Sequence, residues 1–223
     1  MIVSTLVLVE ACEICRMNLF NRTLMDKQIV KLSTGTRYGN PRSARNSKLA
    51  DEYRQKGYEV IQHGYPLNAF LAIYKGTNPH NELERTVGEI FAENGLSITL
   101  EKDGGTKIRL KDGRMLEMPS LDGIVDNAFS HEIMALKGRP SADKVAEGIK
   151  HSFKVWKQDK NQKIQADVAI TFTPKGTKYH REHIDAGVKE YKRQVSEGQT
   201  EAKPLIYLHV DENHREIYYR NIK

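Results

Sequence analysis

The most informative part of the chain reads Pro119-Ser-Leu-Asp-Gly-Ile-Val-Asp-Asn-Ala-Phe-Ser-His-Glu-Ile-Met-Ala-Leu-Lys-Gly138. Two apolar segments, residues 123–126 and 129–136, meet at a tight turn formed by Asp126 and Asn127. An apolar segment, a short polar turn and a second apolar segment are typical of a β-hairpin. Asp122 precedes the first strand and Glu132 lies within the second, so we expect both carboxylates at one edge of the sheet.

The elements on either side of this hairpin follow from hydrophobic periodicity and from turn residues. Before it, the sequence predicts a helix over 42–56, a hairpin of strands 58–62 and 70–74, a helix over 79–95, and strands over 96–101, 107–110 and 115–118. After it come a helix that starts at Ser141, a strand over 166–173, a helix over 179–197, and strands over 205–210 and 217–219. This order indicates a mixed α/β fold.

Two of these elements carry strong packing signals. The Ser141 helix has an apolar stripe at helical spacing, made of Val145, Ile149, Phe153 and Trp156. The strand over 166–173 contains the near-continuous apolar run Val168-Ala-Ile-Thr-Phe, which is typical of a strand buried on both faces. We therefore expect strands 96–100, 115–118, 129–136 and 166–173 to share one sheet, with the Ser141 helix packed across it.

Length and composition suit one globular domain with an N-terminal extension. The chain has 223 residues, of which 39% are hydrophobic and 29% are charged. We assign residues 1–75 to an N-terminal region and residues 76–223 to the main domain. No apolar run approaches the ~18 residues of a membrane span, and residues 1–11 lack the basic start of a signal peptide. The sequence predicts a cytoplasmic protein without membrane contact, in which Cys12 and Cys15 are reduced thiols.

Asp122 and Glu132 are of the residue type that metal-assisted phosphodiester hydrolysis requires. Carboxylate oxygens hold Mg²⁺ or Mn²⁺, and such an ion activates a water molecule and neutralises the charge that develops on the phosphate. A hairpin supplies two such ligands compactly, one before a strand and one within its neighbour.

The order of elements and the ten-residue spacing from Asp122 to Glu132 resemble the PD-(D/E)XK nuclease superfamily. The resemblance covers roughly residues 79–220 and is closest to nuclease toxin domains of contact-dependent inhibition and phage-borne polymorphic toxin systems. It implies an αβββαβ restriction-endonuclease-like core, in which helices flank a mixed sheet. It also implies that Glu84, with Glu82 as the alternative, joins Asp122 and Glu132 as a ligand of Mg²⁺ or Mn²⁺, or of Zn²⁺. The implied partners are DNA or structured RNA such as tRNA, and an immunity or inhibitor protein.

One position departs from the family's pattern. Where the family has a lysine two residues after the glutamate, this chain has Met134. Lys137 is the predicted stand-in for the catalytic lysine, although strand alternation places it opposite Glu132 unless a bulge intervenes. The following helix offers Lys144 and Lys150 instead. In an alternative interpretation, the aspartates are turn formers and Glu132 is a surface residue of the strand.

Positive charge gathers in the C-terminal half of the chain. Residues 144–193 contain twelve Lys and Arg but only six Asp and Glu, in a chain whose net charge is +6. This concentration favours polyanionic partners through counterion release. The predicted phosphate contacts are Lys144, Lys150, Lys154 and Lys157. Two other functions stay open: a non-catalytic nucleic-acid-binding module, and a metal-independent ribonuclease that uses His180 and His183.

Overall fold

The computed structural model describes residues 41–63, 67–75, 82–101, 107–109, 115–117, 122–127, 129–152, 156–158, 162–164, 166–200 and 206–222. The chain divides into two compact units, Met1–Pro41 and Arg42–Lys223. The second unit therefore begins at Arg42 and includes the helix and hairpin that the sequence assigned to a separate N-terminal region. Cys12 and Cys15 lie outside the described residues.

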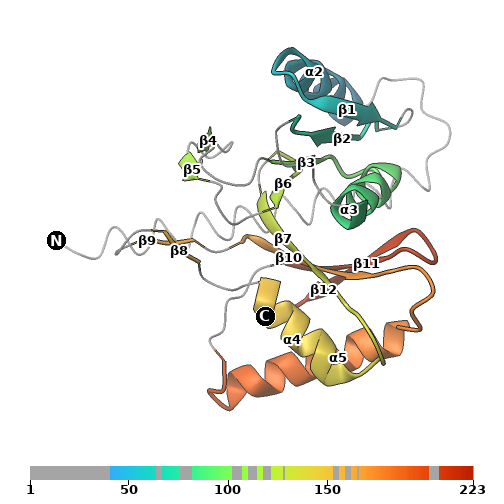
Figure 1. Ribbon diagram of the computed structural model, residues 1–223, viewed down its shortest axis with the longest axis vertical. Helices are drawn as coiled ribbons and strands as arrows, with labels where there is room; N and C mark the ends of the chain where they lie inside the picture. Colours follow the sequence, from blue (N-terminus) through green and yellow to red (C-terminus); the bar gives the residue numbers. More distant parts are fainter. Residues whose placement is uncertain are drawn as a thin grey trace. The chain divides into compact units, whose positions relative to one another are not determined.

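An eight-stranded mixed sheet forms the centre of the Arg42–Lys223 unit, in the order β1-β2-β3-β6-β7-β10-β11-β12 (Figure 1). The pairs β2–β3, β7–β10 and β10–β11 are parallel, and the other neighbouring pairs are antiparallel. The strands are β1 (Glu59–Gln62), β2 (Phe70–Ile73), β3 (Ile98–Leu100), β6 (Gly123–Val125), β7 (Phe129–Ala135), β10 (Val168–Thr173), β11 (Ile206–Asp211) and β12 (Glu216–Asn221).

Helix α3 (Glu82–Glu93) covers one face of this sheet. Its Gly88 backbone lies directly over the side chain of Leu71 in β2. Strand pairing links Leu71 across β3 and β6 to Phe129 of β7, and directly paired residues point to the same face. The turn between β11 and β12 also reaches this helix, because Arg215 forms a bidentate ion pair with Glu93 at 2.5 and 2.6 Å. The sheet therefore curls around α3.

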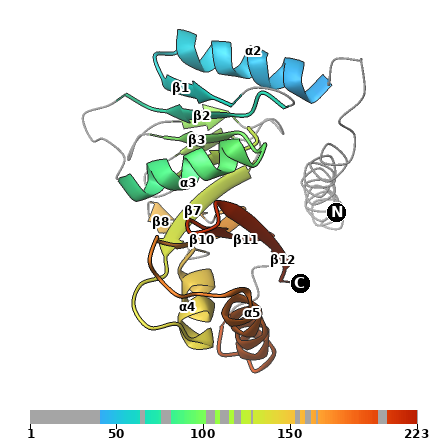
Figure 2. The same ribbon diagram turned by 90° about the vertical axis from the view of Figure 1, so that its right-hand side faces the viewer.

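Helix α4 (Ala142–Ser152) covers the opposite face. Its Gly148 backbone lies over Thr171 of β10, which pairs with Met134 of β7. Side chains alternate along a strand, so Glu132 and Met134 share the α4 face, whereas Phe129 faces α3. Helix α5 (Arg181–Ser196) packs against α4, and Figure 2 shows the two helices next to each other.

Helix α2 (Pro41–Gln55) lies along β1 and β2 (Figure 2). Its residues Ala50 and Tyr53 form an apolar cluster with Phe70 and Ala72 of β2. These two strand residues alternate with Leu71, so α2 lies on the sheet face opposite to α3.

Most of the elements expected from the sequence are confirmed, including the α2 helix, the β1–β2 hairpin and the two long C-terminal helices. One expectation about the sheet is wrong. Strand β5 (Met115–Glu117) pairs with β4 (Lys107–Arg109) in a separate two-stranded sheet, and β6 lies between β3 and β7 in its place. The intervening sequence Lys111-Asp-Gly-Arg favours such a local hairpin.

The apolar stripe predicted for the Ser141 helix is also too long. Helix α4 ends at Ser152, and Phe153 lies outside the described residues. Trp156 instead begins β8 (Trp156–Gln158), which pairs with β9 (Gln162–Ile164) in a further two-stranded sheet. The helical spacing of apolar residues runs on past the helix because no glycine or proline marks its end.

Candidate functional site

The β6–β7 hairpin brings Asp122 beside Glu132. The Oδ2 atom of Asp122 accepts a hydrogen bond of 2.6 Å from the main-chain N–H of Ile133, the residue after Glu132. The Asp122 N–H in turn donates to the His131 carbonyl at 3.1 Å. Glu132 is only 8% exposed. The sequence therefore predicts correctly that a hairpin carries these two residues, and the structure places the Asp122 carboxylate against the backbone next to Glu132.

The turn that closes this hairpin is fixed by its residue types and by α2. Asp126 and Asn127 have φ angles of 52° and 55°, in the left-handed region that Asp and Asn tolerate better than most residues. Asp126 is 4% exposed and forms an ion pair of 3.4 Å with Arg45 of α2. The Tyr53 hydroxyl donates to the Asn127 side chain at 3.2 Å. Helix α2 therefore holds the turn that sets the register of β6 against β7.

Glu101, at the end of β3, is a buried acid next to the pair that sequence reasoning did not single out. It is 2% exposed, and its main-chain N–H donates to the Asp122 carbonyl at 3.0 Å. The Tyr58 hydroxyl donates to its Oε2 atom at 2.5 Å. Burial and the nearby Glu101 charge raise the pKa of Tyr58, so the hydroxyl stays protonated as a donor.

Asp167 is a second buried acid close to this part of the sheet. Its Oδ2 atom accepts hydrogen bonds from the Ser130 main-chain N–H at 3.1 Å and from the Ser130 hydroxyl at 3.0 Å. These bonds join the start of β10 to β7 two residues before Glu132. We interpret Asp167 as a residue that fixes the spacing of β7 and β10.

The predicted third ligand, Glu84, is not brought to the pair. Glu84 lies in the first turn of α3, and α3 covers the sheet face opposite to the one that carries Glu132. In the part of the chain that the structure describes, no group of three or more His, Cys, Asp or Glu side chains is placed to hold a metal ion. The fold places Asp122 next to Glu132 across the β6–β7 pair, with the Asp122 carboxylate on the Ile133 N–H.

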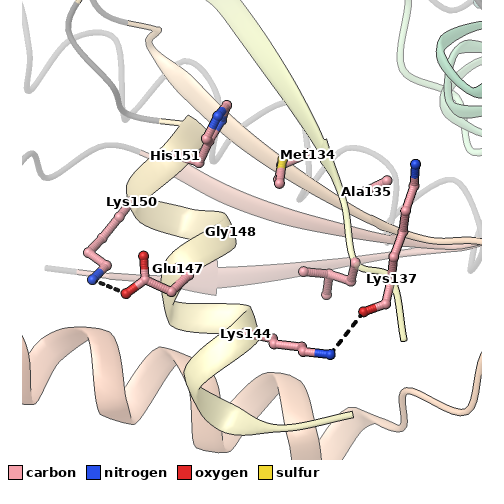
Figure 3. A pocket seen from close by; sticks show the side chains of 9 residues that line it. Met134, Ala135, Lys137, Lys144, Glu147, Gly148, Lys150 and His151 are labelled. Atoms are coloured by element: carbon pink, nitrogen blue, oxygen red, sulfur yellow. Dashed lines mark hydrogen bonds and ion pairs between the residues drawn. The ribbon is translucent and has the colours of Figure 1, made fainter. Parts of the chain in front are cut away.

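A cleft with basic side chains at its rim opens between the second half of β7 and α4. Its volume is about 570 Å³. The residues that line it are Met134, Ala135, Leu136, Lys137, Lys144, Glu147, Gly148, Lys150 and His151. Lys150 forms an ion pair with Glu147, and the Lys144 ammonium donates to the Lys137 carbonyl at 3.2 Å (Figure 3).

The predicted lysines have different places around this cleft. Lys137 lies two residues beyond Ala135, the last residue of β7, so strand alternation no longer sets its direction, and it lines the cleft together with Met134. Lys144 and Lys150 reach the cleft from α4. Lys154 lies outside the described residues, and of Lys157 only the backbone, in β8, is described.

His180 and His183 form the N-terminal cap of α5. His183 Nδ1 accepts a hydrogen bond of 3.1 Å from the His180 N–H, and the His183 N–H donates to the main-chain carbonyl of His180 at 3.0 Å. These bonds satisfy two N–H groups at the start of the helix. His183 Nδ1 thus has a structural role, and acid–base chemistry by this atom would require the cap to open.

A buried polar network on the α4 face centres on His209 of β11. Its Nδ1 atom lies 2.9 Å from the Thr171 hydroxyl, and its Nε2 atom lies 3.1 Å from the Thr173 hydroxyl. The Thr171 hydroxyl also lies 2.6 Å from that of Tyr207, and the Tyr218 ring stacks on the imidazole at 6.1 Å. Burial lowers the pKa of His209 to about 4, so the ring is neutral at physiological pH.

The low pKa of His209 predicts a loss of stability in acid. An unfolded histidine titrates near 6.5, so between about pH 6.5 and 4 the unfolded chain binds a proton that the folded chain excludes. The free energy of unfolding is expected to fall across this window by up to about 3 kcal/mol. Urea unfolding of the wild type and of His209→Gln measures the effect, and the variant should lack this contribution. An NMR titration in which the His209 ring protonates near pH 6.5 would contradict it.

Comparisons with protein families, curated proteins and solved structures give no significant match to this chain. No helix in the described part of the chain has the length and apolar character that a membrane crossing requires.

Proposed function

We propose that this chain is a metal-dependent nuclease that hydrolyses phosphodiester bonds of DNA or of structured RNA such as tRNA. One observation carries the proposal. The 2.6 Å hydrogen bond from the Ile133 N–H holds the Asp122 carboxylate against the backbone next to Glu132, which is itself buried. Two neighbouring buried acids repel each other when both are ionised, and a shared cation relieves that repulsion.

The order of elements supports the resemblance to the PD-(D/E)XK superfamily. Helix α3 precedes β3, β6 and β7, which are neighbours in an antiparallel arrangement. Helix α4 then crosses over to β10, which lies parallel to β7. This order supports an assignment of the αβββαβ pattern that the resemblance implies, in which β4–β5 and β8–β9 would be additions in separate sheets.

The donor atoms of the pair fit a hard divalent cation. Asp122 and Glu132 offer carboxylate oxygens, which Mg²⁺ and Mn²⁺ prefer, and Zn²⁺ accepts them as well. When bound, such an ion supplies an activated water molecule and neutralises charge on the phosphate. In this proposal Asp122 and Glu132 bind the ion, the Ile133 N–H orients the Asp122 carboxylate, and Lys137 stabilises the phosphate charge from the cleft rim. A role as a toxin with an immunity protein as partner stays a prediction of the resemblance.

A non-catalytic nucleic-acid-binding module is the second candidate. Met134 favours it, because this residue lies on the same sheet face as Glu132 at the position where the superfamily has a lysine. In this case the basic cleft and the rest of the basic segment would bind phosphates, and the acid pair would have no role in cleavage.

Both candidates predict binding that weakens steeply as salt rises. Lysine contacts to phosphates release counterions, so log K falls as log salt rises, and each lost contact makes this negative slope shallower by about 1. The double variant Lys150→Glu/Lys154→Glu is therefore expected to make the slope shallower by about 2, whatever the base sequence. Exposed Lys48 and Lys75, outside the basic segment, provide the matched control as Lys48→Glu/Lys75→Glu. Binding that does not respond to salt would contradict a phosphate interface.

One cleavage assay separates the candidate functions. The protein is incubated with plasmid DNA and with total tRNA, in Mg²⁺, in Mn²⁺ and in EDTA. Cleavage that requires the ion supports the proposed nuclease, and binding without cleavage supports the second candidate. Cleavage of RNA in EDTA would instead indicate a metal-independent ribonuclease, for which His180→Ala and His183→Ala are the next variants.

A further inference from the structure

The cleft between β7 and α4 has an apolar wall and a cationic rim. The wall consists of Met134, Ala135, Leu136 and Gly148, and the rim carries Lys137, Lys144, Lys150 and His151. A volume of about 570 Å³ lies within the range of about 300–1,000 Å³ that is typical of small-molecule sites. A ligand that fits both surfaces has a flat or apolar part and an anionic part.

The charges at the rim favour an anion strongly. The single acid of the cleft, Glu147, is already paired with Lys150. Among the described residues, no carboxylate pairs with the ammonium group of Lys137 or Lys144. Both of these side chains are exposed, and Figure 3 shows the Lys144 ammonium at the Lys137 carbonyl while the Lys137 side chain extends in another direction. Two cations without a carboxylate partner next to an apolar wall suit a ligand that carries both a phosphate group and a planar ring.

The cleft lies close to the acid pair along β7. Met134 is two residues beyond Glu132 on the same face of β7, a distance of about 7 Å along the strand. A group in the cleft therefore lies next to whatever is bound at Asp122 and Glu132. Thr171 lies beneath Gly148, so the close approach of α4 to β10 closes the bottom of the cleft.

We infer that this cleft is a nucleotide subsite: it holds the nucleotide next to the scissile phosphodiester, with its base against Met134 and its phosphate between Lys137 and Lys144. The inference rests on the proposed nuclease function in one respect: the bound nucleotide is part of the nucleic-acid strand that the protein cleaves. The binding chemistry itself is that of a nucleoside monophosphate, and it requires neither a metal ion nor cleavage.

Titration with 5′-AMP in metal-free buffer, followed by amide NMR shifts, tests the subsite. The amide signals of Met134, Gly148 and His151 should shift together. AMP should bind at least about tenfold more tightly than inorganic phosphate or adenosine, because each of these contacts only one of the two surfaces. The variant Lys137→Gln/Lys144→Gln should weaken AMP binding at least about tenfold, and the control Lys48→Gln/Lys75→Gln should leave it within about twofold. If AMP binds no better than phosphate, or if both double variants weaken it equally, the inference is overturned.

A second arm distinguishes a free nucleotide from one within a strand. A short single-stranded oligonucleotide with uncleavable linkages should displace AMP from the wild type, and Lys137→Gln/Lys144→Gln should weaken its binding as well. An oligonucleotide that binds without displacing AMP would overturn the assignment of the cleft to the strand. Neither arm measures cleavage. If both give the expected result but the protein cleaves no substrate, the nucleotide subsite stands and the proposed nuclease function is wrong.

Discussion

Replacing Glu132 with glutamine is expected to lower the rate of phosphodiester cleavage about 1,000-fold, which corresponds to about 4 kcal/mol of activation free energy. The substitution keeps the size of the side chain and one acceptor oxygen, but it removes the charge that the proposed ion requires. Asp122→Asn should have a similar effect, because Asp122 lies against the backbone next to Glu132. Plasmid or tRNA cleavage under single-turnover conditions measures both losses.

The control for this prediction is Glu182→Gln, an exposed acid in the first turn of α5. It should cleave at the wild-type rate. The Glu132 variant should unfold at the wild-type temperature and bind nucleic acid within a few-fold of the wild type, since the phosphate contacts lie elsewhere. Cleavage by Glu132→Gln at the wild-type rate would remove the acid pair from the mechanism. Lys137→Ala then reports on the predicted lysine, and activity that survives this change would place that role elsewhere.

Replacing Gly123 with alanine is expected to destabilise the fold by about 3 kcal/mol or more. A Cβ atom at this position would lie 1.8 Å from the Thr99 carbonyl oxygen and 2.9 Å from His131 Nε2. The first obstacle is a backbone atom of the neighbouring strand, so β3 and β6 would have to move apart. His131 would lose its position as well, because its Nε2 atom lies 3.2 Å from the same carbonyl. Urea unfolding gives the loss as a lower midpoint.

Gly176→Ala is the matched control for this loss. Gly176 has a φ of 82° and no atom near the Cβ position, so alanine there meets only the left-handed strain of about 1–2 kcal/mol. Equal losses in the two variants would contradict the close contact at Gly123. Because Gly123 follows Asp122 directly, the variant should also lose cleavage, and its residual activity reports on how far the strands have separated.

The β6–β7 hairpin could be predicted because its signals are local. Asp126 and Asn127 mark the turn, and the apolar segments beside them pair with each other, so short-range sequence is sufficient. The position of β6 between β3 and β7 was not part of the predicted sheet, because the pairing of β3 with β6 spans the inserted β4–β5 hairpin. The sheet that contains β5 could not be predicted in this way. The backbone N–H and C=O groups of β5 can form hydrogen bonds equally well with the neighbouring β4 or with a strand of the main sheet.

The surroundings of the acid pair depend on long-range contacts that no short pattern contains. The buried Glu101 carboxylate accepts its hydrogen bond from Tyr58, which lies 43 residues earlier in the chain. Asp167 is satisfied by Ser130, at a separation of 37 residues. A charged residue at the end of the apolar strand 96–101 was the available signal for Glu101. Glu84 was assigned from the resemblance alone, and the packing of α3 on the opposite face of the sheet could not be deduced from its spacing.

The most direct test of the acid pair is a crystal of the wild type soaked in Mn²⁺ and measured at a wavelength where manganese scatters anomalously. The proposed function predicts one strong anomalous peak at the β6–β7 hairpin, within about 2.0–2.6 Å of a carboxylate oxygen of both Asp122 and Glu132. The same soak of a Glu132→Gln crystal should give no peak there. A wild-type crystal without a peak at this pair, or with its only peak elsewhere, would contradict the proposal that these two residues hold the ion.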